Sequence, residues 1–289
     1  MSARALAIAA IERGTVALMR HGPPAWGHRW AGFLGRRLVP PLHPGQMACI
    51  RHNIATLRPD LPPEESAATA MEHITRGFCE AAVFWRFWEE GRVEVAGEEN
   101  LGRNPSLFIG LHTGQWELLP VTGARFGHRG VGPHQKPPST FRERVLQEGY
   151  ARTRAVGPLP DGPHMGARLA AALRRGDTLL LHLDETLTSG IPTSPRLGRA
   201  LSPTGNLLYA ARLWHMTGVA PQLAWVERLP GPRFRVHIGP PLEVPRGGGR
   251  QAEIRACMQA LDDAADAVVR ANLLQWLFLS EFAIQGSAG

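Results

Sequence analysis

The stretch Leu107-Phe-Ile-Gly-Leu-His-Thr-Gly-Gln-Trp-Glu117 constrains the fold more than any other part of the chain. Its first five residues form a short apolar run, which predicts a buried β-strand that ends just before His112. Gly114 then allows a tight turn, and a helix is predicted to begin near Gln115. A strand that runs through a short turn into a helix is typical of an α/β protein, in which residues at strand ends form binding sites.

His112 and Glu117 are five positions apart, with the predicted turn between them. On one continuous helix these side chains would point apart, because neighbours on a helix face are three or four residues apart. Across a turn, the carboxylate of Glu117 can fold back onto the imidazole, fix its tautomer and raise its basicity. We therefore predict that His112 is a general base oriented by Glu117. The alternative is a helix-capping or loop-bonding histidine followed by an ordinary first-turn acid.

Apolar runs and alternating segments elsewhere predict an α/β fold with a mixed central sheet flanked by helices. The run from Thr178 to Asp184 is almost wholly apolar, as expected for a strand covered on both faces, and it delivers Asp184 and Glu185 to a strand end. His182 in this run is predicted to be a core residue. Residues 233–238 alternate and are predicted to form an edge strand. The other strands are predicted at 93–97, 107–111, 130–135 and 219–226, and the helices at 3–20, 26–39, 48–57, 64–89, 116–126, 140–154, 165–174, 203–216 and 251–270.

Positive charge is concentrated near the N-terminus. The formal net charge of the chain is +7, and residues 1–60 contain eight arginines against Glu12 and Asp60. A basic terminal segment suits an anionic membrane surface or a nucleic acid, and no nucleic-acid-binding motif accompanies it. Trp26 and Trp30 at helical spacing beside arginines fit an interfacial helix, although a core-packing stripe would show the same pattern. We therefore predict one structural unit, with a helical, basic, membrane-facing portion at 1–90 and an α/β core at 91–289.

Several classes of protein are disfavoured by the sequence. Three cysteines without close spacing indicate neither a disulfide framework nor a zinc site, and the simple inference is a reducing cytoplasm. No apolar run approaches the ~18 residues that span a bilayer. His112 lacks the second histidine of an HExxH zinc motif, and no glycine-rich dinucleotide motif follows a strand. We accordingly expect no metal and no bound cofactor.

The full string Gly110-x-His-x-Gly-Gln-Trp-Glu117 resembles the H-x4-D/E motif of the glycerolipid and lysophospholipid acyltransferases. It is most similar to the branch with the bacterial lipid A biosynthesis (lauroyl and myristoyl) acyltransferases and the phosphatidylinositol mannoside acyltransferases. That branch usually has Asn at the position of Gln115 and Asp-Gln at Asp184-Glu185. Leu274-Gln-Trp276 also resembles the Gln-Trp pair that closes the branch, whereas the polar loop at 186–203 matches only loosely.

This resemblance implies an O-acyltransferase that moves a fatty acyl group from acyl-carrier protein or acyl-CoA to a hydroxyl of a membrane glycolipid or phospholipid, with a lipid A-type acceptor favoured. The enzyme would lie peripherally on the cytoplasmic face of the inner membrane. His112 would be the base and Glu117 its orienting group. Backbone amides of the turn at 113–115 are candidates for an oxyanion or phosphate site. The candidate substrate-binding residues are Gly114, Gln115, Trp116, Lys136, Arg154, Asp184 and Glu185.

Two other functions are compatible with the same residues. In a thioesterase-like acyl hydrolase, water would replace the lipid hydroxyl. In a non-catalytic lipid-binding relative, the departures at Gln115, Glu185 and the loop near Arg196 would have removed the activity. A product assay with and without lipid separates the acyltransferase from the hydrolase.

Overall fold

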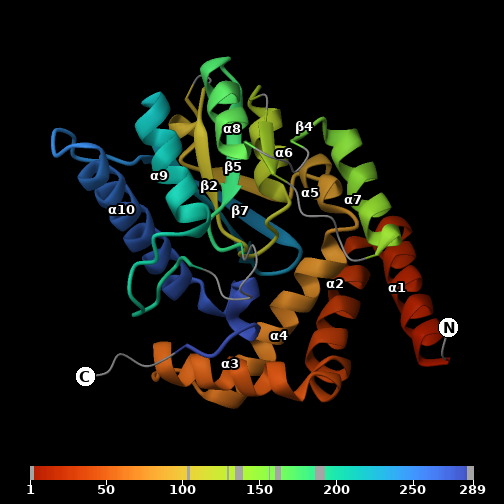
Figure 1. Cartoon of the computed structure of the whole chain (residues 1–289). Helices are drawn as coiled ribbons and strands as arrows, with labels where there is room; N and C mark the ends of the chain where they lie inside the picture. The colour runs from red at the N-terminus through yellow and green to blue at the C-terminus, as the bar shows by residue number, and fades with distance from the viewer. Residues whose placement is uncertain are drawn as a thin grey trace.

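The computed structural model describes residues 3–102, 105–128, 130–133, 139–155, 157–159, 164–185 and 193–284. A seven-stranded mixed sheet lies at its centre, in the order β1-β7-β6-β2-β5-β3-β4. All neighbouring strands run parallel except β6 and β7, which are antiparallel. The α/β class and the mixed sheet flanked by helices are therefore confirmed (Figure 1). The strands are β1 (Val93–Ala96), β2 (Leu107–Gly110), β3 (Gly130–Pro133), β4 (Gly157–Leu159), β5 (Thr178–His182), β6 (Pro221–Leu229) and β7 (Arg233–Pro241).

One strand assignment from the sequence is wrong. Residues 233–238 belong to β7, which pairs with β1 on one side and β6 on the other and is therefore an interior strand. The strand at this edge of the sheet is β1, whose four residues are all half-buried. Alternation does not distinguish the two cases, because an interior strand with one partly exposed face alternates like an edge strand. The short strand β4 at the opposite edge was not predicted.

The helices cover both faces of the sheet. One core cluster packs α8, α9 and α10 against odd-numbered residues of β2 and β5, such as Ile109 and Leu181. The second packs α5, α6 and α7 against the other face, which includes Phe108 and Leu180. Figure 1 shows these two groups of helices on opposite sides of the sheet. The helices are α1 (Ala3–His21), α2 (Pro24–Phe33), α3 (Pro44–Leu57), α4 (Pro63–Glu80), α5 (Phe84–Glu89), α6 (Leu118–Arg125), α7 (Thr140–Thr153), α8 (Met165–Arg174), α9 (Gly205–Thr217) and α10 (Arg250–Ala271).

The helix predicted at 64–89 is two helices, which is a second correction. Helix α4 ends at Glu80, and α5 begins at Phe84. Ala82, Val83 and Phe84 are consecutive and all buried. Val83 has a φ of −146°, which is outside the helical range, so the helix is interrupted between Glu80 and Phe84. The interruption also leaves Glu80 at the end of α4, facing the sheet rather than solvent.

The N-terminal helices are joined to the rest of the chain through buried polar contacts. A π-helical turn, η1 (Leu34–Leu38), and a short 3-10 helix, η2 (Pro40–Leu42), link α2 to α3. Asn53 on α3 donates to the carbonyls of Leu279 and Phe282 and accepts from the amide of Ile284. This side chain thus fastens α3 to the C-terminal segment, which approaches the end of β2 through the pair Thr113 and Trp276.

Candidate active site

Two neighbouring parallel strands bring the central residues of the site together. The register of β2 and β5 sets Gly110 beside His182. Two residues further along each strand, the backbone amide of His112 donates to Asp184 Oδ2 over 2.9 Å. Gly110 and His182 face α6, since a Cβ at Gly110 would contact both the His182 ring and Leu119. His112 and Asp184 lie just beyond the ends of the two strands. The carboxyl ends of adjacent parallel strands therefore form the site, as is usual in open α/β sheets.

His112 is oriented by Asp184 rather than by Glu117. The Nδ1–H group of His112 donates to Asp184 Oδ1 over 2.8 Å, and the carboxylate is fully buried. The Nε1–H group of Trp276 donates to Asp184 Oδ2 over 2.9 Å and fixes the carboxylate from the other side. Nδ1 is thus occupied, and Nε2 is the ring nitrogen that can act on a bound molecule. Asp184 supports the imidazole, which differs from the predicted role in binding substrate.

Glu117 takes part in the site in a different way from the one predicted. It lies immediately before α6, and its carboxylate accepts a hydrogen bond from the hydroxyl of Tyr150 on α7. Burial and the nearby charge of Glu117 raise the pKa of Tyr150 well above its ordinary value, so the phenol keeps its proton. The local spacing of His112 and Glu117 could not reveal this partner, because Tyr150 lies on a helix that follows later in the chain.

Carboxylates control the proton affinity of His112. Burial lowers the pKa of the imidazole, but the charge and hydrogen bond of Asp184 raise it, with further contributions from the charges of Glu185 and Glu117. The net result is a pKa above the ordinary histidine value. Burial raises the pKa of Asp184, but the charge and hydrogen bonds of His112, with a further contribution from the charge of His182, together lower it by more, so Asp184 is the ionised partner.

The turn between β2 and α6 is held by buried contacts on its far side. Gly114 has a φ of +59°, and a Cβ there would lie 2.5 Å from the carbonyl oxygen of Val226, so the turn requires glycine. Arg228 Nη2 donates to the Gly114 carbonyl over 3.3 Å, and the backbone carbonyl of Gln275 accepts from the Gly114 amide over 3.2 Å. The amide of Thr113 also donates within the chain, to Leu111. These two amides are therefore engaged, contrary to the prediction that they serve an oxyanion.

Gln115 and Trp116 face different surroundings. Gln115 is fully buried, and its Nε2 donates to the carbonyl of Gly77 on α4 over 3.0 Å. This side chain ties the turn to α4, which differs from the predicted contact with substrate. Trp116 packs its ring edge-on against His112, with ring centroids 5.6 Å apart. Gly77 makes room for the indole, since a Cβ there would lie 2.8 Å from it.

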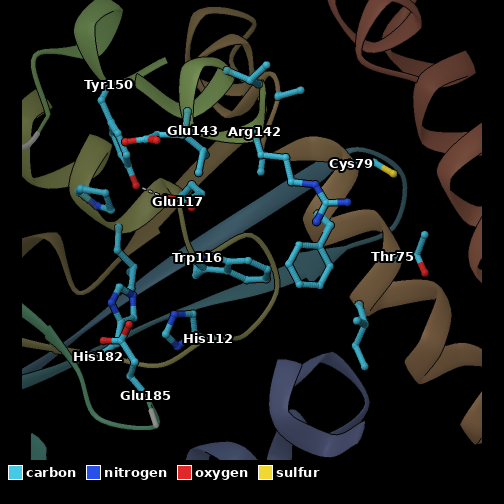
Figure 2. A pocket seen from close by; sticks show the side chains of 18 of the residues that line it. Thr75, Cys79, His112, Trp116, Glu117, Arg142, Glu143, Tyr150, His182 and Glu185 are labelled. Atoms are coloured by element: carbon cyan, nitrogen blue, oxygen red, sulfur yellow. Dashed lines mark hydrogen bonds between the residues drawn. The ribbon is translucent and has the colours of Figure 1, made fainter. Parts of the chain in front are cut away.

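A large cavity opens over His112. Its volume is about 1700 Å³, whereas sites for drug-sized molecules typically measure about 300–1000 Å³. Figure 2 shows His112, His182 and Glu185 close together, with Trp116 beside them and the Glu117–Tyr150 pair further along the wall. Its apolar lining residues come from the N-terminal helices, α4, α6, α7 and the sheet, and include Leu34, Leu38, Leu42, Met71, Ile74, Phe78, Phe108, Leu119, Val145, Leu146 and Leu180.

The remaining predicted site residues have mixed outcomes. Trp116, Glu117, Arg154 and Glu185 line the cavity, whereas Gly114, Gln115 and Asp184 are not among the described lining residues. Arg154 is exposed and caps the end of α7 with a left-handed backbone. The predictions for Lys136 and for residues 186–192 of the polar loop lie outside the described residues.

Sequence reasoning missed the roles of two residues and misassigned a third. His182, predicted to be a core residue, lines the cavity and packs on His112. Tyr150 and Trp276 supply the hydrogen bonds to Glu117 and Asp184. A usable signal existed for His182: Gly110-x-His112 and His182-x-Asp184 have the same spacing at the ends of two predicted strands.

No model of a known protein family matches this chain, and no curated protein matches it significantly. Among the residues that the structure describes, no group of three or more His, Cys, Asp or Glu side chains is arranged to hold a metal ion.

If His112 acts as a general base in a reaction, replacing Asp184 with asparagine should change both the rate and the pH profile. The histidine must be neutral to accept a proton, so kcat/KM should fall as the pH drops through the raised pKa of His112. Loss of the Asp184 charge lowers that pKa, and the acidic limb of kcat/KM should then move to lower pH while kcat/KM falls by about a hundredfold or more. Asp262→Asn is the control, because Asp262 is also buried but binds Ser194. An acidic limb that does not move in the Asp184 variant would refute this role.

Proposed function

We propose that the protein is an O-acyltransferase that transfers a fatty acyl group from acyl-carrier protein or acyl-CoA to a hydroxyl of a membrane glycolipid or phospholipid, with a lipid A-type acceptor favoured. The observation that carries the proposal is the imidazole of His112, held by the buried carboxylate of Asp184 within a large cavity with many apolar lining residues. A histidine–carboxylate pair supplies a base. The size of the cavity suits an acyl chain together with part of a lipid acceptor.

The proposed reaction needs a single proton relay. Nε2 of His112 accepts the proton of the acceptor hydroxyl while the hydroxyl oxygen attacks the thioester carbonyl. The carbon–sulfur bond then breaks, the acyl group remains on the acceptor as an ester, and the leaving thiolate takes the proton from His112. Asp184 stabilises the imidazolium that exists between these steps. No covalent acyl-enzyme is required.

The proposed site of action is the cytoplasmic face of the inner membrane, where the protein would bind peripherally, and an exposed apolar surface supports contact with a membrane. None of the helices in the described ranges is long and apolar enough to cross a membrane. Trp26 and Phe33 are exposed on the surface of α2, by 62% and 49%. Leu42 and Phe78 are likewise exposed and also line the cavity, so exposed apolar side chains border the space over His112. A lipid could pass from a membrane surface into such a cavity without crossing water.

We expect the double variant Arg29→Glu/Arg37→Glu to bind anionic vesicles at least about tenfold more weakly, because each basic residue near the surface contributes on the order of 1 kcal/mol. Both side chains are exposed, and Arg29 shares a helix face with Trp26 and Phe33. Arg36 is left unchanged because it pairs with Glu72. Co-sedimentation with vesicles at rising salt is the measurement.

The matched control is Arg212→Glu/Arg255→Glu, which makes the same change of charge on α9 and α10. It should bind vesicles like the wild type. Equal binding of the wild type to neutral and anionic vesicles at every salt concentration would contradict the membrane proposal.

The function is tested by incubating the wild-type protein with a radiolabelled acyl donor, with and without a total lipid extract. The proposal predicts that label enters ester-linked lipid and that donor consumption requires the extract. Release of free fatty acid at the same rate without lipid would instead identify a hydrolase. Lipid binding without any turnover of either donor would identify a non-catalytic lipid-binding protein.

A further inference from the structure

A second imidazole packs directly on the one that the proposed reaction uses. The ring centroids of His182 and His112 are 4.2 Å apart, and the ring planes are inclined by 31°. Both side chains line the cavity, and Figure 2 shows them next to each other near Glu185. Among the described residues, the other rings that pack on His112 are those of Trp116 and Phe278, which lie edge-on and carry no charge.

The backbone is arranged to admit this second ring. Gly110 is the register partner of His182 on β2, and a Cβ at Gly110 would lie only 2.9 Å from Cδ2 of the His182 ring. Asn206 on α9 donates to the carbonyl of His182 over 2.7 Å and fixes the strand at this point. The contact between the two histidines therefore follows from strand pairing and from a glycine that leaves the space free.

The negative charges at the site favour the protonated form of His112, which cannot act as a base, and a positive charge on a second imidazole would counter this effect. Asp184, Glu185 and Glu117 all favour a positive charge on His112, and a base that already carries a proton cannot accept another. Tyr150 keeps its proton and therefore adds no charge to the site. Among the groups that the structure describes next to His112, His182 is thus the one able to carry a compensating positive charge.

We propose that His182 is a positioning residue for the base: its ring packs on His112 and shares with it the single positive charge that the carboxylates attract. The inference rests on the proposed function, in which His112 must be neutral to act. Two like charges this close are held together only at a substantial energetic cost. The pair therefore titrates in two coupled steps, and a proton on His182 leaves His112 neutral more of the time.

The test compares His182→Phe with His182→Ala in the full-length protein. Phenylalanine keeps a ring against His112 but cannot carry charge, whereas alanine removes both. Histidine side chains labelled with ¹³C or ¹⁵N are titrated by NMR, and the pH dependence of kcat/KM is measured in parallel. In both variants the pKa of His112 should rise, by roughly one unit, and its titration should become a single step. The acidic limb of kcat/KM should move to higher pH by the same amount.

His237→Phe is the matched control, because His237 stacks on Trp225 on the sheet and is not among the described residues that line the cavity. It should leave the titration of His112 unchanged. If His182→Phe titrates like the wild type while His182→Ala loses activity, His182 acts only by packing, and the inference is overturned. The NMR result does not depend on turnover, so a failure of the acyltransferase proposal itself remains distinguishable.

Discussion

Replacing Arg228 with methionine should lower the free energy of unfolding by about 3–5 kcal/mol, because it leaves the buried carboxylate of Glu80 without its main partner. The two side chains are 2% and 0% exposed, and their closest nitrogen and oxygen atoms are 2.7 Å apart. Burial raises the pKa of Glu80, but the charges and hydrogen bonds of Arg228 and His28 together lower it by more, so Glu80 is ionised in the wild type. Chemical denaturation of the wild type and the variant measures the effect.

The loss of stability should depend on pH in a defined direction. Without Arg228 the effect of burial remains and His28 alone opposes it, so we expect the folded-state pKa of Glu80 to rise above its unfolded value. A raised carboxyl pKa means that stability is retained at low pH and lost as the pH rises through the folded-state pKa. The difference between variant and wild type should therefore be larger at neutral pH than at acidic pH.

A double variant distinguishes two causes of the lost stability: the unpaired charge of Glu80 and the lost packing of the Arg228 side chain. Glu80→Leu/Arg228→Met removes both charges and should recover most of the lost stability, because a buried ion pair is often replaced by apolar residues at little net cost. If the single Arg228 variant unfolds with nearly wild-type stability, the pair does not hold α4 to β6 as described. The same arginine also bonds the Gly114 carbonyl, so its loss should loosen the turn after His112.

The main elements of the fold could be predicted from the sequence because their signals are local. The apolar runs that became β2 and β5 and the helical period of α8 each lie within a few residues. Helix α8 begins at Met165 and ends at Arg174, as its spacing and its last-turn arginine predicted. The break after Glu80 was not predictable in this way, because the partner of Glu80 lies on β6, in a distant part of the sequence.

The partner of His112 illustrates the same limit at the site. Glu117 is close in sequence and was the natural choice for the orienting carboxylate. Asp184 is distant in sequence, and only the parallel register of β2 and β5 places it beside the imidazole. Strand ends could be predicted from the sequence, whereas the pairing between them depends on which strands become neighbours. Tyr150 was missed for the same reason.

Replacing His112 should remove most of the proposed acyltransferase activity, since a positioned general base typically contributes about 10²–10⁴-fold. Glu117→Gln should be milder, because Asp184 would still orient the ring and only one of the charges that favour its protonated form is lost. His112→Asn is a useful companion to His112→Ala. Its side-chain amide can still donate to Asp184 but cannot act as a base, so it separates catalysis from the support of the carboxylate.

The most direct test of the central claim is acyl transfer from a labelled donor to lipid, measured on folded His112→Ala and His112→Asn proteins that still bind vesicles. Folding is checked by melting temperatures within a few degrees of the wild type. If His112 is the general base, both variants should transfer label into lipid at about 10²–10⁴-fold lower kcat/KM, and the asparagine should rescue little of the loss. Near-wild-type transfer by either folded variant would contradict the assignment and leave His112 as a structural residue at the end of β2.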